Sequence, residues 1–157
     1  MGYRKFLKII IQLSINMGVA VLVLLIINPA IAQKSGLAVL SGEHVVPEEI
    51  QTPAAGHFKL YIIGDTLEVK GEFENLKDSY ESAGIFYGPK GEPGNRLFRL
   101  SVTLDSERTG GSAKREDNKF GISSSIKQLL KKGEMYIAIS SRAHSHGELR
   151  GQIIFNN

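Results

Sequence analysis

Apolar and polar side chains alternate with a period of two along residues 57–63 and again along residues 67–74. Successive side chains of a β-strand point to opposite faces, so this period predicts strands with one buried face and one solvated face. Gly64 and Asp65, which separate the two runs, are typical of a tight turn. The pattern therefore predicts a β-hairpin.

Short apolar or alternating runs recur along the rest of the chain and predict further strands at 37–40, 83–87, 96–104, 135–139 and 148–155. The runs follow one another at intervals of roughly ten residues, which is typical of an antiparallel sandwich or a Greek-key barrel. We therefore expect an all-β fold, an antiparallel Greek-key or immunoglobulin-like β-sandwich.

One segment of this part of the chain has the period of a helix. Apolar residues recur at i, i+3 and i+4 within 123–132, Ser123 or Ser124 can cap the start, and Gly133 suits a left-handed stop. We expect one short helix there. Residues 105–119 are rich in charge, Gly and Ser, so we expect an exposed, flexible loop.

The first 32 residues differ in kind from the rest. A basic start is followed by an apolar run at 9–27 and then by Ala30-Ile31-Ala32, the order of residues found in a signal peptide. We expect cleavage after Ala32 and a single domain at 33–157. The alternative is an uncleaved anchor, because 19 helical residues span roughly 28 Å, close to the thickness of a bilayer core.

The signal segment changes how the charge is interpreted. The chain has 19 basic and 16 acidic residues, and three of the basic ones lie within residues 1–32, so residues 33–157 carry 16 of each. A formally neutral domain does not favour nucleic-acid binding. Cysteine is absent, so disulfides, thiol catalysis and thiolate metal sites are excluded and packing alone must hold the fold.

Several motifs, in order along residues 40–155, resemble those of the CHRD domain family, named after chordin and found singly in many exported bacterial proteins. The matching pieces are Leu40-Ser41-Gly42 with Val46-Pro47, Thr52-Pro53-Ala54-Ala55-Gly56, Ala83-Gly84-Ile85-Phe86-Tyr87-Gly88-Pro89, Leu129–Gly133 with Tyr136-Ile137-Ala138-Ile139, and His144-Ser145-His146-Gly147-Glu148-Leu149-Arg150-Gly151-Gln152-Ile153. The last piece is the most specific, because G-E-[LI]-R-G-Q is an uncommon string. The resemblance implies an immunoglobulin-like or Greek-key β-sandwich that acts as an extracellular, protein-binding module.

The chain departs from the family pattern mainly at histidines. Gly84, Phe86 and Ser140 stand where the family has histidine, Val45 stands where it has glutamate, and only His144 keeps the family's histidine. A site that used those histidines would be mostly lost in this divergent member. The resemblance implies structural roles for the remaining motif residues Gly42, Pro47, Gly56, Gly88, Gly147, Glu148, Arg150 and Gly151.

The sharpest chemical feature is the pair His144 and His146. Residues at i and i+2 of a strand point to the same side, so two imidazoles could share a metal ion, with Glu148 as a further weak candidate ligand. The simpler interpretation is two exposed histidines in a turn. Glu148 and Arg150 could likewise face a ligand as a charged pair, but a structural brace is favoured. The aromatic residues, Phe86 and Tyr136 among them, are expected in the core or at its rim.

We therefore expect an exported, non-catalytic module without a cofactor. Its expected partner is a protein or a component of the cell envelope, contacted through a sheet face or through the loops at 88–94 and 105–119. No nucleic acid is expected as a partner, and a membrane only through residues 9–27 if the signal is not cleaved. The expected location is periplasmic or secreted. The alternative is a metal-binding or redox protein that uses His144 and His146.

Overall fold

A computed structural model of the chain describes residues 33–155. The signal sequence and the alternative anchor expected at residues 1–32 lie outside the described residues. Within residues 33–155, no helix is long and apolar enough to cross a membrane.

The described chain consists mainly of short strands. In chain order they are β1 (Lys34–Ser41), β2 (Ala55–Ile63), β3 (Thr66–Glu74), β4 (Tyr80–Tyr87), β5 (Asn95–Arg99), β6 (Thr103–Leu104), β7 (Gly111–Ala113), β8 (Lys119–Gly121), β9 (Met135–Ser141), β10 (Leu149–Gln152) and β11 (Ile154–Phe155). The helical elements are α2 (Ser124–Lys132) and the two 3-10 turns η1 (Gly42–His44) and η2 (Arg115–Asp117). This confirms the predicted all-β class with one short helix.

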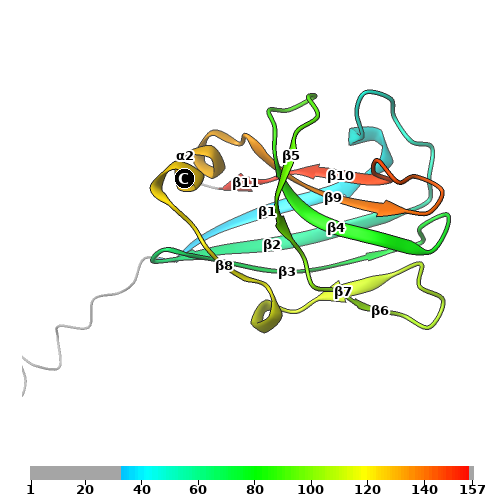
Figure 1. Cartoon of the computed structure of the whole chain (residues 1–157), viewed down its shortest axis with the longest axis horizontal. Coiled ribbons are helices and arrows are strands. Elements are labelled where there is room, and N and C mark those ends of the chain that lie inside the picture. The colour runs from blue at the N-terminus through cyan, green and yellow to red at the C-terminus, as the bar shows by residue number, and fades with distance from the viewer. Residues whose placement is uncertain (1–32, 156–157) are drawn as a thin grey trace, which may run out of the picture. The chain divides into compact units, whose positions relative to one another are not determined.

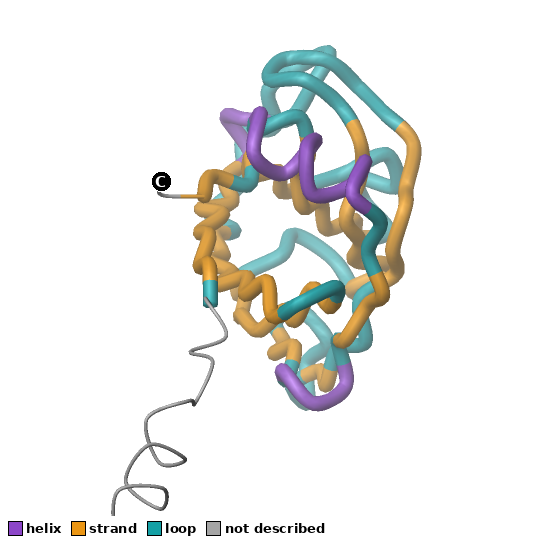
Figure 2. Tube along the Cα trace, turned by 90° about the vertical axis from the view of Figure 1, so that its left-hand side faces the viewer, coloured by secondary structure: helices purple, strands orange, loops and turns teal. Residues whose placement is uncertain are grey.

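The strands form one continuous antiparallel sheet in the order β5-β4-β9-β10-β1-β2-β3-β7-β6, with β11 beside β1 and β8 beside β3 (Figure 1). The sheet curls around its own interior, which Figure 2 shows from the side. The expected sandwich would divide the strands between two sheets. Here β1 joins the two halves, because it pairs with β2 along one edge and with β10 and β11 along the other.

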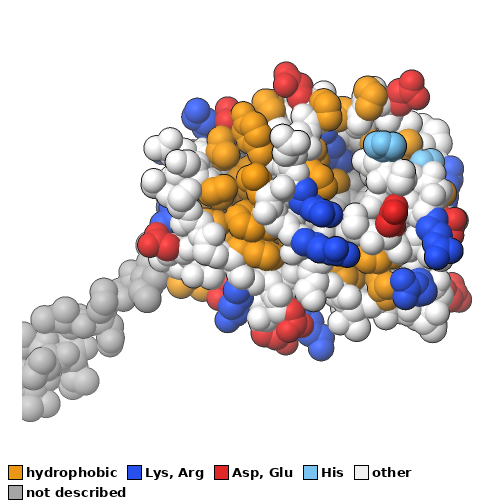
Figure 3. Space-filling model, viewed as in Figure 1, with side chains coloured by type: hydrophobic (Ala, Val, Ile, Leu, Met, Phe, Trp, Pro, Cys, Tyr) orange, Lys and Arg blue, Asp and Glu red, His pale blue; other side chains and the backbone are white. Residues whose placement is uncertain are grey.

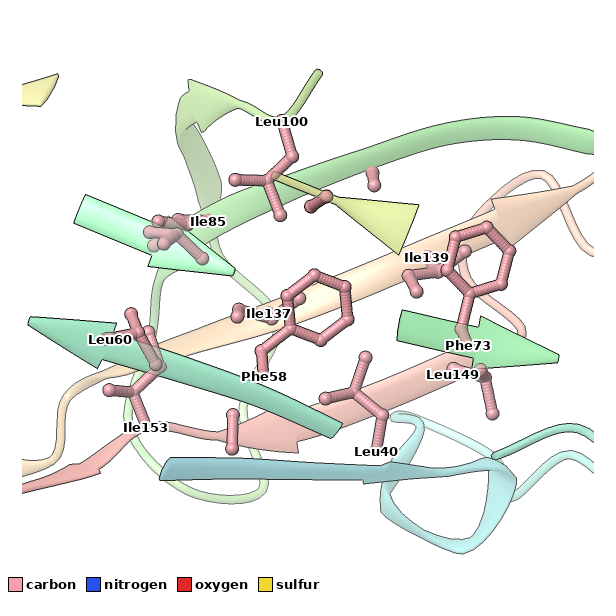
Figure 4. Packing of buried hydrophobic residues seen from close by; sticks show 14 of the residues in the cluster. Leu40, Phe58, Leu60, Phe73, Ile85, Leu100, Ile137, Ile139, Leu149 and Ile153 are labelled. Atoms are coloured by element: carbon pink, nitrogen blue, oxygen red, sulfur yellow. The ribbon is translucent and has the colours of Figure 1, made fainter. Parts of the chain in front are cut away.

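The hairpin predicted around Gly64 and Asp65 is confirmed. β2 and β3 pair in register from Ala55 opposite Glu74 to Ile63 opposite Thr66. Their inward residues, including Phe58, Leu60, Leu67 and Val69, have no exposed surface. Side chains from β1, β2, β9 and β10 point into the same interior (Figure 4). The period of two thus correctly identifies the buried face.

The helix predicted at 123–132 is confirmed as α2. The Ser123 side chain accepts a hydrogen bond from the Ile126 amide at 3.3 Å, and Gly133 ends the helix in the left-handed region at φ 70°. The Gly133 amide donates to the carbonyls of Leu129 and Leu130, which satisfies acceptors that the end of the helix would otherwise leave unpaired.

Segment 105–119 contains more secondary structure than its composition predicts. It includes β7 and η2, and β7 pairs with β3. Asn118 is fully buried, and its side chain bonds Ser101 N at 2.8 Å and Ser101 O at 2.9 Å. Backbone pairing and one polar side chain hold the segment, so apolar periodicity could not reveal it.

Candidate functional site

Glu148 has no exposed surface and is fully engaged by hydrogen-bond donors. Its Oε1 accepts from the Thr52 hydroxyl at 2.5 Å and from the Lys77 amide at 2.8 Å, and its Oε2 accepts from the Ser141 hydroxyl. These donors come from the loop before β2, the loop after β3 and the end of β9. The carboxylate of Glu148 therefore joins three segments of the chain through hydrogen bonds.

Arg150 lies in β10, two residues beyond Glu148, and the two side chains have separate partners. Its guanidinium carbon lies 3.7 Å from the centroid of the Tyr136 ring, and its Nη2 donates to the Pro89 carbonyl at 3.2 Å. The residue is 5% exposed. Desolvation by this burial lowers the pKa of the Arg150 guanidinium, but arginine starts so high that it stays charged.

The loop at 88–94, expected as an exposed contact loop, is fixed at both ends by β9 and β10. Besides Arg150, the Gln152 amide donates to the Gly88 carbonyl at 3.0 Å, and the Gly94 amide donates to the Tyr136 hydroxyl at 3.0 Å. A Cβ at Gly88 would lie 2.9 Å from the Tyr136 ring, so glycine is needed for this close approach. The loop at 88–94 is therefore held in one conformation and forms a wall against β9 and β10.

This wall encloses a cavity of about 300 Å³. Arg150, Tyr136 and Phe86 line it from the sheet, the loops supply Pro47 and Pro93, and His146 lies at its exposed side. The Phe86 and Tyr136 rings stack with their centroids 5.2 Å apart. The cavity thus combines aromatic and apolar walls with one buried cation. Sequence analysis placed Phe86 and Tyr136 in the core or at its rim and did not identify this pocket.

The positions where the family resemblance expects histidines lie on the face of β4 and β9 that turns away from the core. Gly84 pairs with Ala138, and Phe86 pairs with Tyr136. On the same face, the Ser140 hydroxyl lies 2.8 Å from the Ser82 hydroxyl. This face continues to Arg150, which pairs with Ala138. Two of the departures from the family pattern, Val45 and Phe86, line the cavity, and each places an apolar side chain there.

The two candidate metal ligands in the turn before β10 are differently placed. His146 is exposed and lies against the cavity, while His144 is half-buried in the turn and does not line the cavity. Glu148, the third candidate, is occupied by its three donors. Across residues 33–155, no three His, Cys, Asp or Glu side chains are arranged to hold a metal ion.

Glycines of the family motifs lie where the backbone leaves no room or turns sharply. Gly147 has φ 132°, outside the range that other residues adopt easily, and it places Glu148 at the start of the final strands. A Cβ at Gly151 would overlap the Val39 carbonyl of β1. A Cβ at Gly42 would overlap the Ile50 carbonyl, and one at Gly56 would lie only 3.0 Å from the Glu72 carbonyl and the Phe73 Cβ.

The described chain is an all-β domain with a buried Glu148 and a stacked Arg150, and its motif segments meet around one cavity. These features define a class of small β modules. The comparison with known families is specific: residues 37–153 match the CHRD domain. The chain therefore belongs to the CHRD domain family, whose members are typically extracellular or exported. A search among curated proteins found no match.

Proposed function

We propose that this chain is an exported, non-catalytic module that binds a partner in the cell envelope or outside the cell, and that the Arg150 cavity is its binding site. The observation that carries the proposal is the convergence of motif segments from far apart in the sequence. The cavity is built from the segments around Pro47, Phe86, Tyr136 and Arg150. Packing of these segments around a common hydrophobic core would not by itself require a pocket between them, so the pocket points to binding.

The chemistry of the cavity supports binding rather than catalysis. Its lining, within the described part of the chain, contains one imidazole, that of His146, but no serine, threonine or cysteine nucleophile and no carboxylate beside it. The Tyr136 hydroxyl already accepts the Gly94 amide. Rigid aromatic and apolar walls with one fixed charge are typical of recognition sites.

Export is supported by the family and by the sequence of residues 1–32. A basic start, an apolar run and Ala30-Ile31-Ala32 form the order of a signal peptide. The domain also lacks cysteine, so an oxidising compartment would not change its covalent structure.

Site-specific photo-crosslinking tests the proposal. A photo-reactive residue at His146, which is exposed beside the cavity, should give a discrete adduct with an envelope or secreted protein in the producing cell. The matched position is Lys131, which is exposed on α2 and does not line the cavity. The adduct at position 146 should disappear when Pro47→Trp fills the cavity. Equal adducts at both positions, or none at 146, would contradict the proposal.

A further inference from the structure

Arg150 is a buried cation without a carboxylate partner in the described chain. The ion pairs within residues 33–155 involve His57, Arg115, Lys119 and Lys127, and none involves Arg150. The only hydrogen bond that its guanidinium makes there is to the Pro89 carbonyl. A buried charge is costly unless it is paired, and a ring face plus one carbonyl compensate only part of that cost.

The Arg150 N–H groups that do not bond Pro89 have access to the cavity. A guanidinium presents five N–H donors in a planar fork. In the described chain, no side-chain nitrogen or oxygen that is fully enclosed lacks a hydrogen-bond partner. The Arg150 nitrogens without a protein acceptor are therefore still accessible, and the accessible space beside Arg150 is the cavity. The fork is held in place by stacking on Tyr136.

We propose that the Arg150 cavity binds a carboxylate that is attached to a small apolar group. This inference rests on the proposed function, since it takes the cavity to be the binding site. The carboxylate would accept two parallel hydrogen bonds from the free edge of the guanidinium. The apolar group would have the stacked rings of Phe86 and Tyr136 on one side and the prolines Pro47 and Pro93 on the other.

The composition of the cavity selects a carboxylate among anions. Arg150 is the only lysine or arginine in its lining, and His146 is the only other side chain there that can become cationic. One fixed positive charge matches a monoanion, whereas a phosphate monoester carries nearly two negative charges at neutral pH. The volume of about 300 Å³ lies at the small end of ligand pockets, which suits a compact acid or a single chain end.

Titration with matched probes tests the inference on the full mature chain. N-acetyl-leucine carries a carboxylate on an apolar body, and N-acetyl-leucinamide has the same body without the charge. We expect the acid to bind at least about tenfold more tightly than the amide, because the charged, bidentate hydrogen bonds are lost in the amide. Binding should shift the amide resonances of Gly94 and Gly147, which line the cavity.

Two further probes distinguish the sources of the carboxylate. Hexanoate represents a free apolar acid, and inorganic phosphate represents an anion without an apolar body. Tighter binding of N-acetyl-leucine than of hexanoate would assign the cavity to a chain end of a partner protein, and the reverse order would assign it to a small acid. Equal binding of acid and amide, or tighter binding of phosphate, would overturn the inference.

A pair of substitutions in the turn before β10 tests the site without changing the hydrophobic core. His146→Glu places a competing carboxylate beside the cavity and should weaken binding of N-acetyl-leucine by at least about tenfold. His144→Glu makes the same change of charge two residues away, outside the lining, and should leave the affinity within about twofold. Equal weakening by both variants would assign the effect to general charge and reject the cavity as the site.

The outcome can be separated from failure of the proposed function. If crosslinking at position 146 captures a partner while none of the acids binds, the cavity is a binding site and the assignment of a carboxylate is wrong. If crosslinking fails as well, the proposed function itself is wrong.

Discussion

Glu148 shows at the level of one residue how a short motif can suggest the wrong partner. Glu148 and Arg150 stand two apart, which on a regular strand would place both side chains on one face. Glu148, however, precedes β10 and follows Gly147 at φ 132°. Its carboxylate turns inward to Thr52, Lys77 and Ser141, while Arg150 packs on Tyr136.

Replacing this carboxylate tests its role as a fastener. We expect Glu148→Gln to lower the free energy of unfolding by about 1.5–3 kcal/mol, because an amide places donor hydrogens where the carboxylate accepts from donors. Urea denaturation measures the change. Glu92→Gln, at an exposed position, serves as the control and should stay within about 0.5 kcal/mol of the parent. A similar stability of both variants would show that the hydrogen bonds to Glu148 contribute little.

The residues that the sequence identified for chemistry are only partly those that the structure brings together. His146 does lie at the cavity, but Arg150 and Tyr136 are its distinctive pair, and they are 14 positions apart in the sequence. Their stacking depends on β9 and β10 pairing with Gln152 opposite Tyr136 and Arg150 opposite Ala138. A period of two predicts which face a residue occupies, but it carries no information about register between strands.

At the level of elements, the sequence pattern predicted those elements that are determined by neighbouring residues in the chain. The β2–β3 hairpin follows from alternation and a tight turn, and α2 follows from a cap, an apolar stripe and a glycine stop. The short strands β7 and β8 did not emerge, because each has only three residues and relies on pairing with the distant strand β3. Backbone pairing of this kind leaves no periodic signature in the side chains.

The edge formed by η2 and β8 is tied to β3 by an ionic cluster that can be tested by titration. Glu68 on β3 bonds the Arg115 side chain and lies 3.4 Å from Lys119 Nζ. The hydrogen bond from Arg115 is the largest cause that lowers the pKa of Glu68. The guanidinium of Arg115 also lies 4.4 Å from the centroid of the Tyr61 ring.

Arg115→Gln should therefore raise the pKa of Glu68, and carboxyl-carbon NMR titration measures it. A carboxyl whose pKa is lowered by folding stabilises the protein above its unfolded pKa, and this contribution is lost as the pH falls through the folded pKa. The variant should consequently lose less stability on acidification than the parent. Arg142→Gln, which removes an exposed arginine elsewhere, should leave the Glu68 titration unchanged. An unchanged pKa in Arg115→Gln would assign the shift to another cause.

On the scale of the whole molecule, the seam between β1 and the strands β10 and β11 joins the two halves of the sheet. β1 pairs along its full length with β2, but it meets β10 and β11 at only a few register positions, Ser41 with Arg150, and Gly36 and Leu37 with Phe155 and Ile154. Hydrophobic side chains also gather on an outer face near α2 and β5, next to basic ones (Figure 3). The cavity forms on the β4–β9–β10 side of this seam, so the site depends on the seam staying closed.

Gly151→Ala tests the seam directly. The added methyl group would overlap the Val39 carbonyl, so β1 and β10 must move apart, and we expect a loss of about 1–3 kcal/mol in unfolding free energy. Gly121→Ala is the matched control, because a Cβ there meets nothing within 4 Å and the residue is exposed. Thermal and urea denaturation compare the two. Equal stability of the two variants would show that β1 and β10 can accommodate the extra methyl group without a loss of stability.

The fold also bears on where export processing should cut the chain. β1 begins at Lys34, which already pairs with Ile62, and the expected cleavage after Ala32 leaves only Gln33 ahead of that strand. Cleavage there removes the apolar run without removing a paired residue. We therefore expect intact-mass and N-terminal peptide spectra of the exported protein to begin at Gln33.

A substitution at Ala32 tests whether the chain is cleaved after this residue. Signal peptidase requires a small residue at the last position of the signal, so Ala32→Leu should block cleavage and leave a membrane-bound precursor. Ala20→Leu makes the same change within the apolar run and should leave processing intact. If the parent chain itself retains residues 9–27, the segment is an anchor, and the module then acts at the membrane surface with its cavity tethered there.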